Sequence, residues 1–237
     1  MAVALIYSIS GGGKTVNSTR VKGGFTTFDE KTGKLISTKP KGKIKLLSSD
    51  NSHIVLNNFE RPNVDVEVVK QYLEGDGDIG FIQRFTNAID ENKYDTIICD
   101  NLSTLFDTAI LELTETGKFK DLRNAYQTVY LAFKRLVRQA NNANCNIIFT
   151  AWCDYEDTIN ANGEVVKRSQ PKLPAKILDS FCGLCNIVGT VAKTSNGEYV
   201  FALEGTATRY AKDQIYCRKG CRPEELFVVQ KKNGGNK

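Results

Sequence analysis

A glycine-rich segment near the amino terminus has the residue types and spacing to bind phosphate. It reads Ser8-Ile9-Ser10-Gly11-Gly12-Gly13-Lys14-Thr15 and matches the phosphate-loop pattern GxxxxGK(S/T) at every fixed position except the first. In such a loop the backbone N–H groups of residues 10–14 wrap a β-phosphate, and the dipole of the following helix adds to them. The ammonium of Lys14 neutralises β- and γ-phosphate oxygens, and the hydroxyl of Thr15 reaches magnesium. The sequence therefore predicts a site for ATP and Mg²⁺ at Ser10 to Thr15.

The first position of this loop departs from the pattern, because Ser8 stands where glycine is usual. Serine tolerates a positive φ poorly, so the substitution bears on the tight first turn. The alternative interpretation is a glycine-rich turn that binds nothing. Val3 to Tyr7 has the pattern of a buried strand that runs into the loop, and a helix is expected after it, so the context favours phosphate binding.

A second apolar run ends in the carboxylate that a phosphate loop requires. Asp100 follows the strand predicted at Thr96 to Cys99, and we predict that it is the Walker B aspartate that orients the metal. The alternative role, capping of the next helix, is compatible with metal binding. Asn101 stands where many AAA+ enzymes have a glutamate base, which favours a RecA-type organisation whose base comes from elsewhere.

Three further residues are candidates for the catalytic site. Asp50 and Glu60 are candidate bases, and Asp50 is favoured because it follows the strand Ile44 to Ser48 and parallel sheets gather ligands at the carboxyl ends of their strands. Either could instead be an ordinary turn residue. Thr150 lies in the predicted strand Asn146 to Ala151, where a polar sensor of the γ-phosphate would lie, or it is a plain strand threonine.

These residues need a framework that brings strand ends together. The alternation of apolar runs and helical patterns predicts an α/β phosphate-loop NTPase with a RecA-like, mostly parallel sheet flanked by helices and a C-terminal β-hairpin. Helices are expected at Asn63 to Leu73, Ile79 to Ile89, 102–113, 122–137 and Leu173 to Cys185, and hairpins at Phe25 to Thr38 and Ile187 to Leu203. Asn162-Gly163, in the polar stretch after Ala151, is a strong signal for a two-residue hairpin turn. We expect one domain over residues 1–228, with a basic hairpin inserted at about 22–43, and a flexible basic tail over residues 229–237.

Composition excludes several other classes of protein. The 237 residues, 41% of them hydrophobic, suffice for one full core, and no apolar run is long enough to cross a bilayer, so a cytoplasmic protein without a membrane partner is expected.

The net charge of +5 is modest, but Arg20 to Lys45 carries eight basic and two acidic residues. This stretch is either a patch for a polyanion or a solvated loop.

Seven cysteines, an odd number, fit reduced thiols better than a disulfide framework. The pairs Cys182/Cys185 and Cys217/Cys221 have spacings that zinc sites also use. The first pair lies in an apolar helical pattern, where two cysteines usually serve packing, and His53 is the only histidine. No metal other than magnesium is therefore predicted, and zinc is the alternative.

The sequence resembles phage-encoded RecA-core ATPases of single-strand annealing and recombination. The similarity covers nearly the whole chain and rests on the phosphate loop, on 97–102 (IICDNL), on 147–152 (IIFTAW), on 171–176 (PKLPAK) and on 211–213 (AKD). The resemblance implies ATP hydrolysis, single-stranded DNA as a partner, a single-strand-binding protein beside it, assembly into homo-oligomers and a phage-infected bacterial host.

The resemblance also assigns roles to basic residues outside the phosphate loop. In RecA-like proteins two mobile loops contact DNA, and here they correspond to Thr114 to Asp121 and Asp154 to Pro171. Their cations are Lys118, Lys120, Lys167 and Arg168. Arg209 and Lys212 correspond to basic residues that reach the γ-phosphate of a neighbouring subunit. Solvated loops and a solvated helix end are the alternatives.

Two other functions remain open from the sequence. One is a replication-associated motor or helicase loader with the same fold. The other is a nucleotide-gated interaction module without turnover, because no glutamate follows Asp100.

Overall fold

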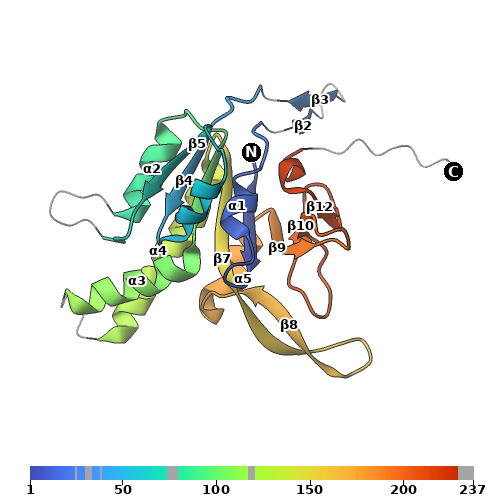
Figure 1. Ribbon diagram of the computed structural model, residues 1–237. Helices are drawn as coiled ribbons and strands as arrows, with labels where there is room; N and C mark the ends of the chain where they lie inside the picture. Colours follow the sequence, from blue (N-terminus) through green and yellow to red (C-terminus); the bar gives the residue numbers. More distant parts are fainter. Residues whose placement is uncertain (25, 30–33, 38, 74–79, 117–120, 229–237) are drawn as a thin grey trace.

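The computed structural model describes residues 1–24, 26–29, 34–37, 39–73, 80–116 and 121–228, and its framework is one mixed β-sheet (Figure 1). Six of the described strands run parallel in the order β9-β1-β7-β6-β4-β5. They are β1 (Val3–Ser8), β4 (Ile44–Ser48), β5 (Val64–Val68), β6 (Thr96–Asp100), β7 (Asn146–Ile159) and β9 (Ile187–Lys193). Three short strands add antiparallel pairs at the β9 side: β10 (Tyr199–Ala202), β11 (Lys212–Asp213) and β12 (Gly220–Cys221). The β9–β10 pair confirms the predicted C-terminal hairpin.

Helices cover both faces of this sheet and bury its strands between two cores. One face packs against α2 (Phe81–Asp90), α3 (Leu102–Glu115), α4 (Leu122–Asn142) and α5 (Ala175–Leu184). The other packs against α1 (Lys14–Ser18), the 3₁₀ helix η1 (Ser52–Asn58) and the C-terminal segment with η2 (Pro223–Glu225). Successive strand residues point to opposite faces, so Leu5 joins the first core and Ile6 the second. The helices predicted near 79–89, 102–113, 122–137 and 173–185 are confirmed as α2 to α5.

The prediction of a helix at Asn63 to Leu73 is wrong, because this segment contains the edge strand β5. Three valines alternate there with Asp65 and Glu67, which is the two-residue period of a strand. Both carboxylates pair with Lys45 of the neighbouring β4, at 3.1 and 2.8 Å. These ion pairs across the two strands hold the edge of the sheet.

Residues 154–171 form a hairpin, as the turn signal at Asn162-Gly163 indicates, and not the mobile loop that the resemblance implies. Strand β7 continues to Ile159 and pairs antiparallel with β8 (Val165–Pro171), and the hairpin extends away from the body of the molecule (Figure 1). Gly163 has φ of 80°, as the predicted turn at Asn162-Gly163 requires.

The inserted hairpin is present as β2 (Thr26–Asp29) and β3 (Lys34–Ser37), which pair antiparallel. Phe25 and Thr38, at the predicted ends of this hairpin, and the predicted tail 229–237 lie outside the described residues. Among the helices that are described, none has both the length and the apolar character to cross a membrane.

A buried ion pair fastens the C-terminal segment to the sheet. Arg218 donates to a carboxylate oxygen of Asp213 at 2.6 Å and to the backbone carbonyls of Glu225 and Leu226 at 2.8 and 2.9 Å. Only 8% of the Arg218 side chain is exposed, and none of the Asp213 side chain. One guanidinium therefore connects β11 to the segment that closes the second core.

Candidate functional site

The glycine-rich segment forms a loop between β1 and α1. Gly11 and Gly13 have φ of 71° and 86°, values that residues with a side chain rarely adopt. Gly12 is needed for space, since a Cβ there would lie 2.5 Å from the hydroxyl of Ser8. All three glycines of the predicted loop are thus required by its shape.

Ser8 at the first loop position is compatible with this shape. It ends β1 in extended conformation, and its hydroxyl donates to the carbonyl of Ile9 at 3.1 Å. The N–H of Gly12 donates to the same carbonyl at 3.1 Å and closes the turn. The first turn therefore forms without a positive φ at Ser8, so glycine is not required there.

Lys14 is held inside the loop. Its side-chain nitrogen donates to the carbonyls of Ser8 and Ile9, each at 3.2 Å, and the residue is 7% exposed. Burial lowers the pKa of Lys14, while the nearby carboxylates of Asp100 and Asp50 raise it. The ammonium therefore lies between the loop and two carboxylates, where phosphate oxygens would be stronger partners than carbonyls.

Asp100 ends β6 at the centre of a cluster of hydroxyls. One carboxylate oxygen accepts from Thr15 at 2.5 Å and from Ser52 at 2.8 Å, and the other accepts from Thr150. Strand β7, which carries Thr150, lies between the strand of the loop and the strand of Asp100. The order of the strands therefore brings the predicted Thr15, Asp100 and Thr150 into direct contact.

This donor set fits Mg²⁺. A carboxylate and a hydroxyl are hard oxygen ligands, and Mg²⁺ usually takes one or two such protein ligands together with waters and substrate phosphates. Thr15 and Asp100 would hold the ion beside the loop. Among the described residues no three His, Cys, Asp or Glu side chains form a metal-binding cluster, so an ion at this site would take its remaining ligands from water and phosphate.

Asp50 lies beside Asp100 and is fixed by hydrogen bonds. The side-chain amide of Asn101 donates to a carboxylate oxygen of Asp50 at 2.6 Å, and the N–H of Ser52 donates to the other at 2.7 Å. The carbonyl oxygen of the Asn101 side chain accepts from the N–H of Thr104 at 2.8 Å and caps α3. Asn101 therefore both starts a helix and orients the carboxylate that follows β4. The peptide bond between Asp100 and Asn101 is cis.

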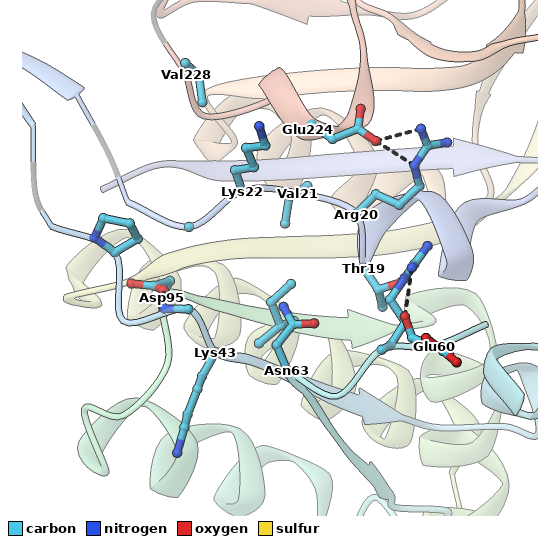
Figure 2. A pocket seen from close by; sticks show the side chains of 15 residues that line it. Thr19, Arg20, Val21, Lys22, Lys43, Glu60, Asn63, Asp95, Glu224 and Val228 are labelled. Carbon is cyan, nitrogen blue, oxygen red and sulfur yellow. Dashed lines mark hydrogen bonds and ion pairs between the residues drawn. The ribbon is translucent and has the colours of Figure 1, made fainter.

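Glu60 is placed away from the phosphate loop. It is exposed and lines a pocket of about 660 Å³ at the amino ends of the parallel strands, with Thr19, Lys43, Asn63 and Asp95 (Figure 2). The phosphate loop lies at the carboxyl ends of the same strands. Of the two candidate bases, the structure therefore brings only Asp50 to the loop.

Two of the four predicted DNA contacts lie outside the described residues, namely Lys118 and Lys120. The other two are paired within the hairpin, where Arg168 lies opposite Glu156 and Lys167 opposite Asp157. Arg168 forms an ion pair with Glu156, and Lys167 lies 3.7 Å from Asp157. Contact of these residues with DNA stays a prediction, but each of the two cations already has a carboxylate neighbour.

The two residues expected to act on a neighbouring subunit differ in their surroundings. Lys212 donates to the carbonyl of Gly183 at 3.2 Å and to the side chain of Gln214 at 3.1 Å, and burial lowers its pKa. Arg209 lies in a loop that bridges to Ser169 at the end of the hairpin. Lys212 would have to give up two hydrogen bonds to reach outward, and the role of both residues stays a prediction.

Three of the four cysteines considered for zinc are packed in the cores of the described chain. Cys182 and Cys185 are fully buried in the first core, and burial raises the pKa of Cys182 to about 12. Cys221 is buried in the second core, and Cys217 is exposed. No thiol belongs to a metal-binding cluster within the described ranges.

Three neighbours of the loop were not predicted from the sequence. Ser52 donates to Asp100, and it could have been found as a polar residue just beyond the carboxyl end of β4. Asn17 donates to the carbonyl of Gly13 at 2.8 Å and accepts from Arg20 at 3.0 Å. Tyr199 of β10 lies against Gly13, where an added Cβ would be 3.3 Å from its ring. No local pattern marks the last two.

A cavity of about 410 Å³ adjoins the loop on the side of the C-terminal hairpin. Ser8, Gly12, Cys153 and Tyr199 are among its lining residues. Lys193 also lines it and places its ammonium 4.8 Å from the centre of the Tyr199 ring. The loop thus has open space, a flat ring and a cation next to it.

A comparison with models of protein families shows the family of the chain. Residues 2–215 match the model of the AAA domain, which is most of the chain. The chain belongs to the AAA domain family. The match agrees with the geometry above, and the fold is that of an α/β phosphate-loop NTPase, as predicted.

Among curated proteins, none matches this sequence. Among solved structures, the chain is similar to a KaiC-like protein from the hyperthermophilic archaeon Pyrococcus horikoshii OT3, with a TM-score of 0.44 and 11% identity. That similarity covers 84% of this chain and 76% of the archaeal chain.

Proposed function

We propose that this AAA-domain protein is a magnesium-dependent ATPase. The observation that supports this most directly is the carboxylate of Asp100, which bridges the hydroxyl of Thr15 from the loop and that of Thr150 from β7 beside the Lys14 ammonium. Thr15 and Asp100 would hold magnesium, which would supply positive charge to offset that of the phosphates. Lys14 would neutralise the same phosphates, and Thr150 would sense the γ-phosphate.

In this proposal Asp50 positions the attacking water. Its carboxylate is oriented by the side chain of Asn101 and lies close enough to Lys14 to affect the pKa of the ammonium. A base has to be oriented and within reach of the water that it activates. The cavity next to the loop would take the nucleoside, with the base against Tyr199, because a flat aromatic ring offers a surface for stacking.

We further propose that hydrolysis serves DNA recombination or annealing on single strands, as the resemblance to phage ATPases implies. The partners would be single-stranded DNA, a single-strand-binding protein and further copies of this chain, with Arg209 at the neighbouring nucleotide. The fold alone would equally suit a replication motor or helicase loader. The specific support for a nucleotide-gated module without turnover is that Asn101, an amide, occupies the position after Asp100.

Phosphate release measured with and without magnesium and single-stranded DNA tests these proposals. We expect magnesium-dependent hydrolysis that single-stranded DNA stimulates. Asp50→Asn should lower the rate constant by about 10²- to 10⁴-fold, the usual contribution of a general base, with little change in ATP affinity. Glu60→Gln is the matched control and should hydrolyse ATP at the wild-type rate. Tight binding of ATP without turnover would instead support the gated module, and equal losses in both variants would refute the role of Asp50.

A further inference from the structure

The outward face of α4 carries cations and aromatic rings but no carboxylate. The helix contains four basic residues, Arg123, Lys134, Arg135 and Arg138, and no aspartate or glutamate. Its other face is buried through Ala125, Val129, Phe133, Leu136, Val137 and Ala140. All the charge of α4 is therefore positive and lies away from the core.

A cavity of about 710 Å³ lies along this face. Arg123, Tyr126, Tyr130 and Lys134 of α4 line it together with Lys176 of α5, and no acidic residue contributes to its lining within the described chain. Arg123 has a carboxylate neighbour in Asp121 at 3.3 Å, but 91% of its side chain is exposed, so the pair is weak. We call these five residues the α4 face.

Two tyrosine rings form the floor of the α4 face. Tyr126 is 39% exposed, and its ring centre lies 6.1 Å from that of Tyr130. Tyr130 is held from below by Phe106, whose nearly parallel ring lies 5.8 Å away. The ammonium of Lys176 lies 6.0 Å from the centre of the Tyr130 ring. Tyr130 is thus fixed by packing, Tyr126 is partly exposed, and both rings line a cavity that three cations also line.

We propose that the α4 face binds a single strand of nucleic acid. Bases would stack on Tyr126 and Tyr130, and phosphates would contact Arg123, Lys134 and Lys176. Aromatic rings beside a cationic groove are how proteins hold single strands without reading their sequence. The helix covers about 16 Å between Arg123 and Lys134, so the phosphates of several nucleotides can be reached. This inference rests on the proposed function and locates its DNA-binding surface.

The β7–β8 hairpin is less suited to the same ligand. Residues 154–171 contain four carboxylates, Asp154, Glu156, Asp157 and Glu164, against two cations, Lys167 and Arg168. Both of these cations face carboxylates across the hairpin. A net negative charge repels a phosphate backbone, whereas the α4 face has three cations and no acid.

Binding of a fluorescent oligothymidylate of about 16 nucleotides, followed by anisotropy in the presence of Mg²⁺ and ATP, tests the inference. Tyr126→Ala removes one stacking ring and should weaken binding about 5- to 150-fold, while Tyr126→Phe, which keeps the ring, should bind like the wild type. Lys134→Gln should lower the slope of log affinity against log salt by about 0.7. Tyr155→Ala and Lys167→Gln make the same changes on the hairpin and should have little effect.

The possible results distinguish the location of the DNA-binding surface from DNA binding itself. Loss of binding in the hairpin variants with wild-type binding in the α4 variants would overturn the inference and leave DNA binding intact. A wild-type protein that binds no oligonucleotide would overturn both. A changed oligomeric state of Tyr126→Ala in light scattering, with unchanged affinity for the oligonucleotide, would assign the α4 face to contacts between subunits and also overturn the inference. An oligouridylate of equal length shows whether the supported site is restricted to DNA.

Discussion

Replacement of Lys14 by methionine should separate the binding of nucleotide from the stability of the fold. Methionine has nearly the same length and keeps the side chain buried, but it removes the ammonium that donates to Ser8 and Ile9. Desolvation of a buried ion costs several kcal/mol, and charge-assisted hydrogen bonds return about 1.5–3 kcal/mol each, so the two terms nearly offset. Without nucleotide, the free energy of unfolding of Lys14→Met should therefore lie within about 1 kcal/mol of the wild-type value.

The same substitution should strongly lower the affinity for ATP and the stabilisation that ATP provides. Two charge-assisted hydrogen bonds to phosphate oxygens account for about 3–6 kcal/mol, which is a loss of about 10²- to 10⁴-fold in affinity. Urea unfolding with and without MgATP measures both effects. At a ligand concentration about 100 times the dissociation constant, the wild type should gain about 2.7 kcal/mol and Lys14→Met almost nothing. Lys22→Met, at an exposed lysine, is the control and should gain as much as the wild type. A wild-type gain in Lys14→Met would refute the assignment of the loop.

Three further predictions concern pH, the C-terminal segment and the thiols. Burial lowers the pKa of Lys14, and a bound triphosphate would restore its charge, so ATP affinity should fall as pH rises through the lowered pKa. Calorimetry from pH 7 to 10 would show this fall, and Lys14→Arg, whose charge is fixed, should give a flatter profile. Arg218→Met leaves the buried carboxylate of Asp213 without its countercharge and should cost about 3–5 kcal/mol in urea unfolding. Lys219→Met removes a neighbouring exposed ion pair and should cost less than about 1 kcal/mol, and equal costs would contradict the argument. Iodoacetamide should modify Cys217 in the folded protein and Cys182 only after unfolding, as peptide mass analysis would show.

The glycine-rich loop and the position of Asp100 beside it could be predicted because each depends on a short, contiguous stretch of sequence. Gly11 to Thr15 has to be contiguous to wrap a phosphate, and Asp100 ends an apolar run that could hardly be anything but a buried strand. The contact between Thr15 and Asp100 followed from the rule that parallel strands gather their carboxyl ends. The same rule favoured Asp50 over Glu60, and the structure places Asp50, of the two, at the loop.

Residues whose role depends on packing between distant segments could not be predicted in this way. Tyr199 approaches Gly13 because β10 pairs with β9, more than 180 residues after the loop, and a lone tyrosine in a strand has no pattern that indicates this. The α4 face could not be predicted for a related reason. Tyr126 fits the apolar stripe of the helix in the sequence, and only the packed structure shows that its side chain is partly exposed.

The β7–β8 hairpin shows that basic residues in a sequence need not be available to bind DNA. The resemblance to RecA-like proteins assigns Lys167 and Arg168 to DNA contact, because a mobile loop at this place in those proteins lets cations meet phosphates. In an antiparallel pair each residue instead meets one fixed partner, and a turn at Asn162-Gly163 places Arg168 opposite Glu156 and Lys167 opposite Asp157. The turn was visible in the sequence, so this register could have been worked out without a structure. Within α4 no such partner is available, because a helix pairs residues three or four positions apart and α4 contains no carboxylate. The neighbour of Arg123 is Asp121, which precedes the helix, and that pair is largely exposed and therefore weak. Cations on a helix without acids keep their charge available to a ligand, and this difference favours the helix over the hairpin as the surface for a polyanion.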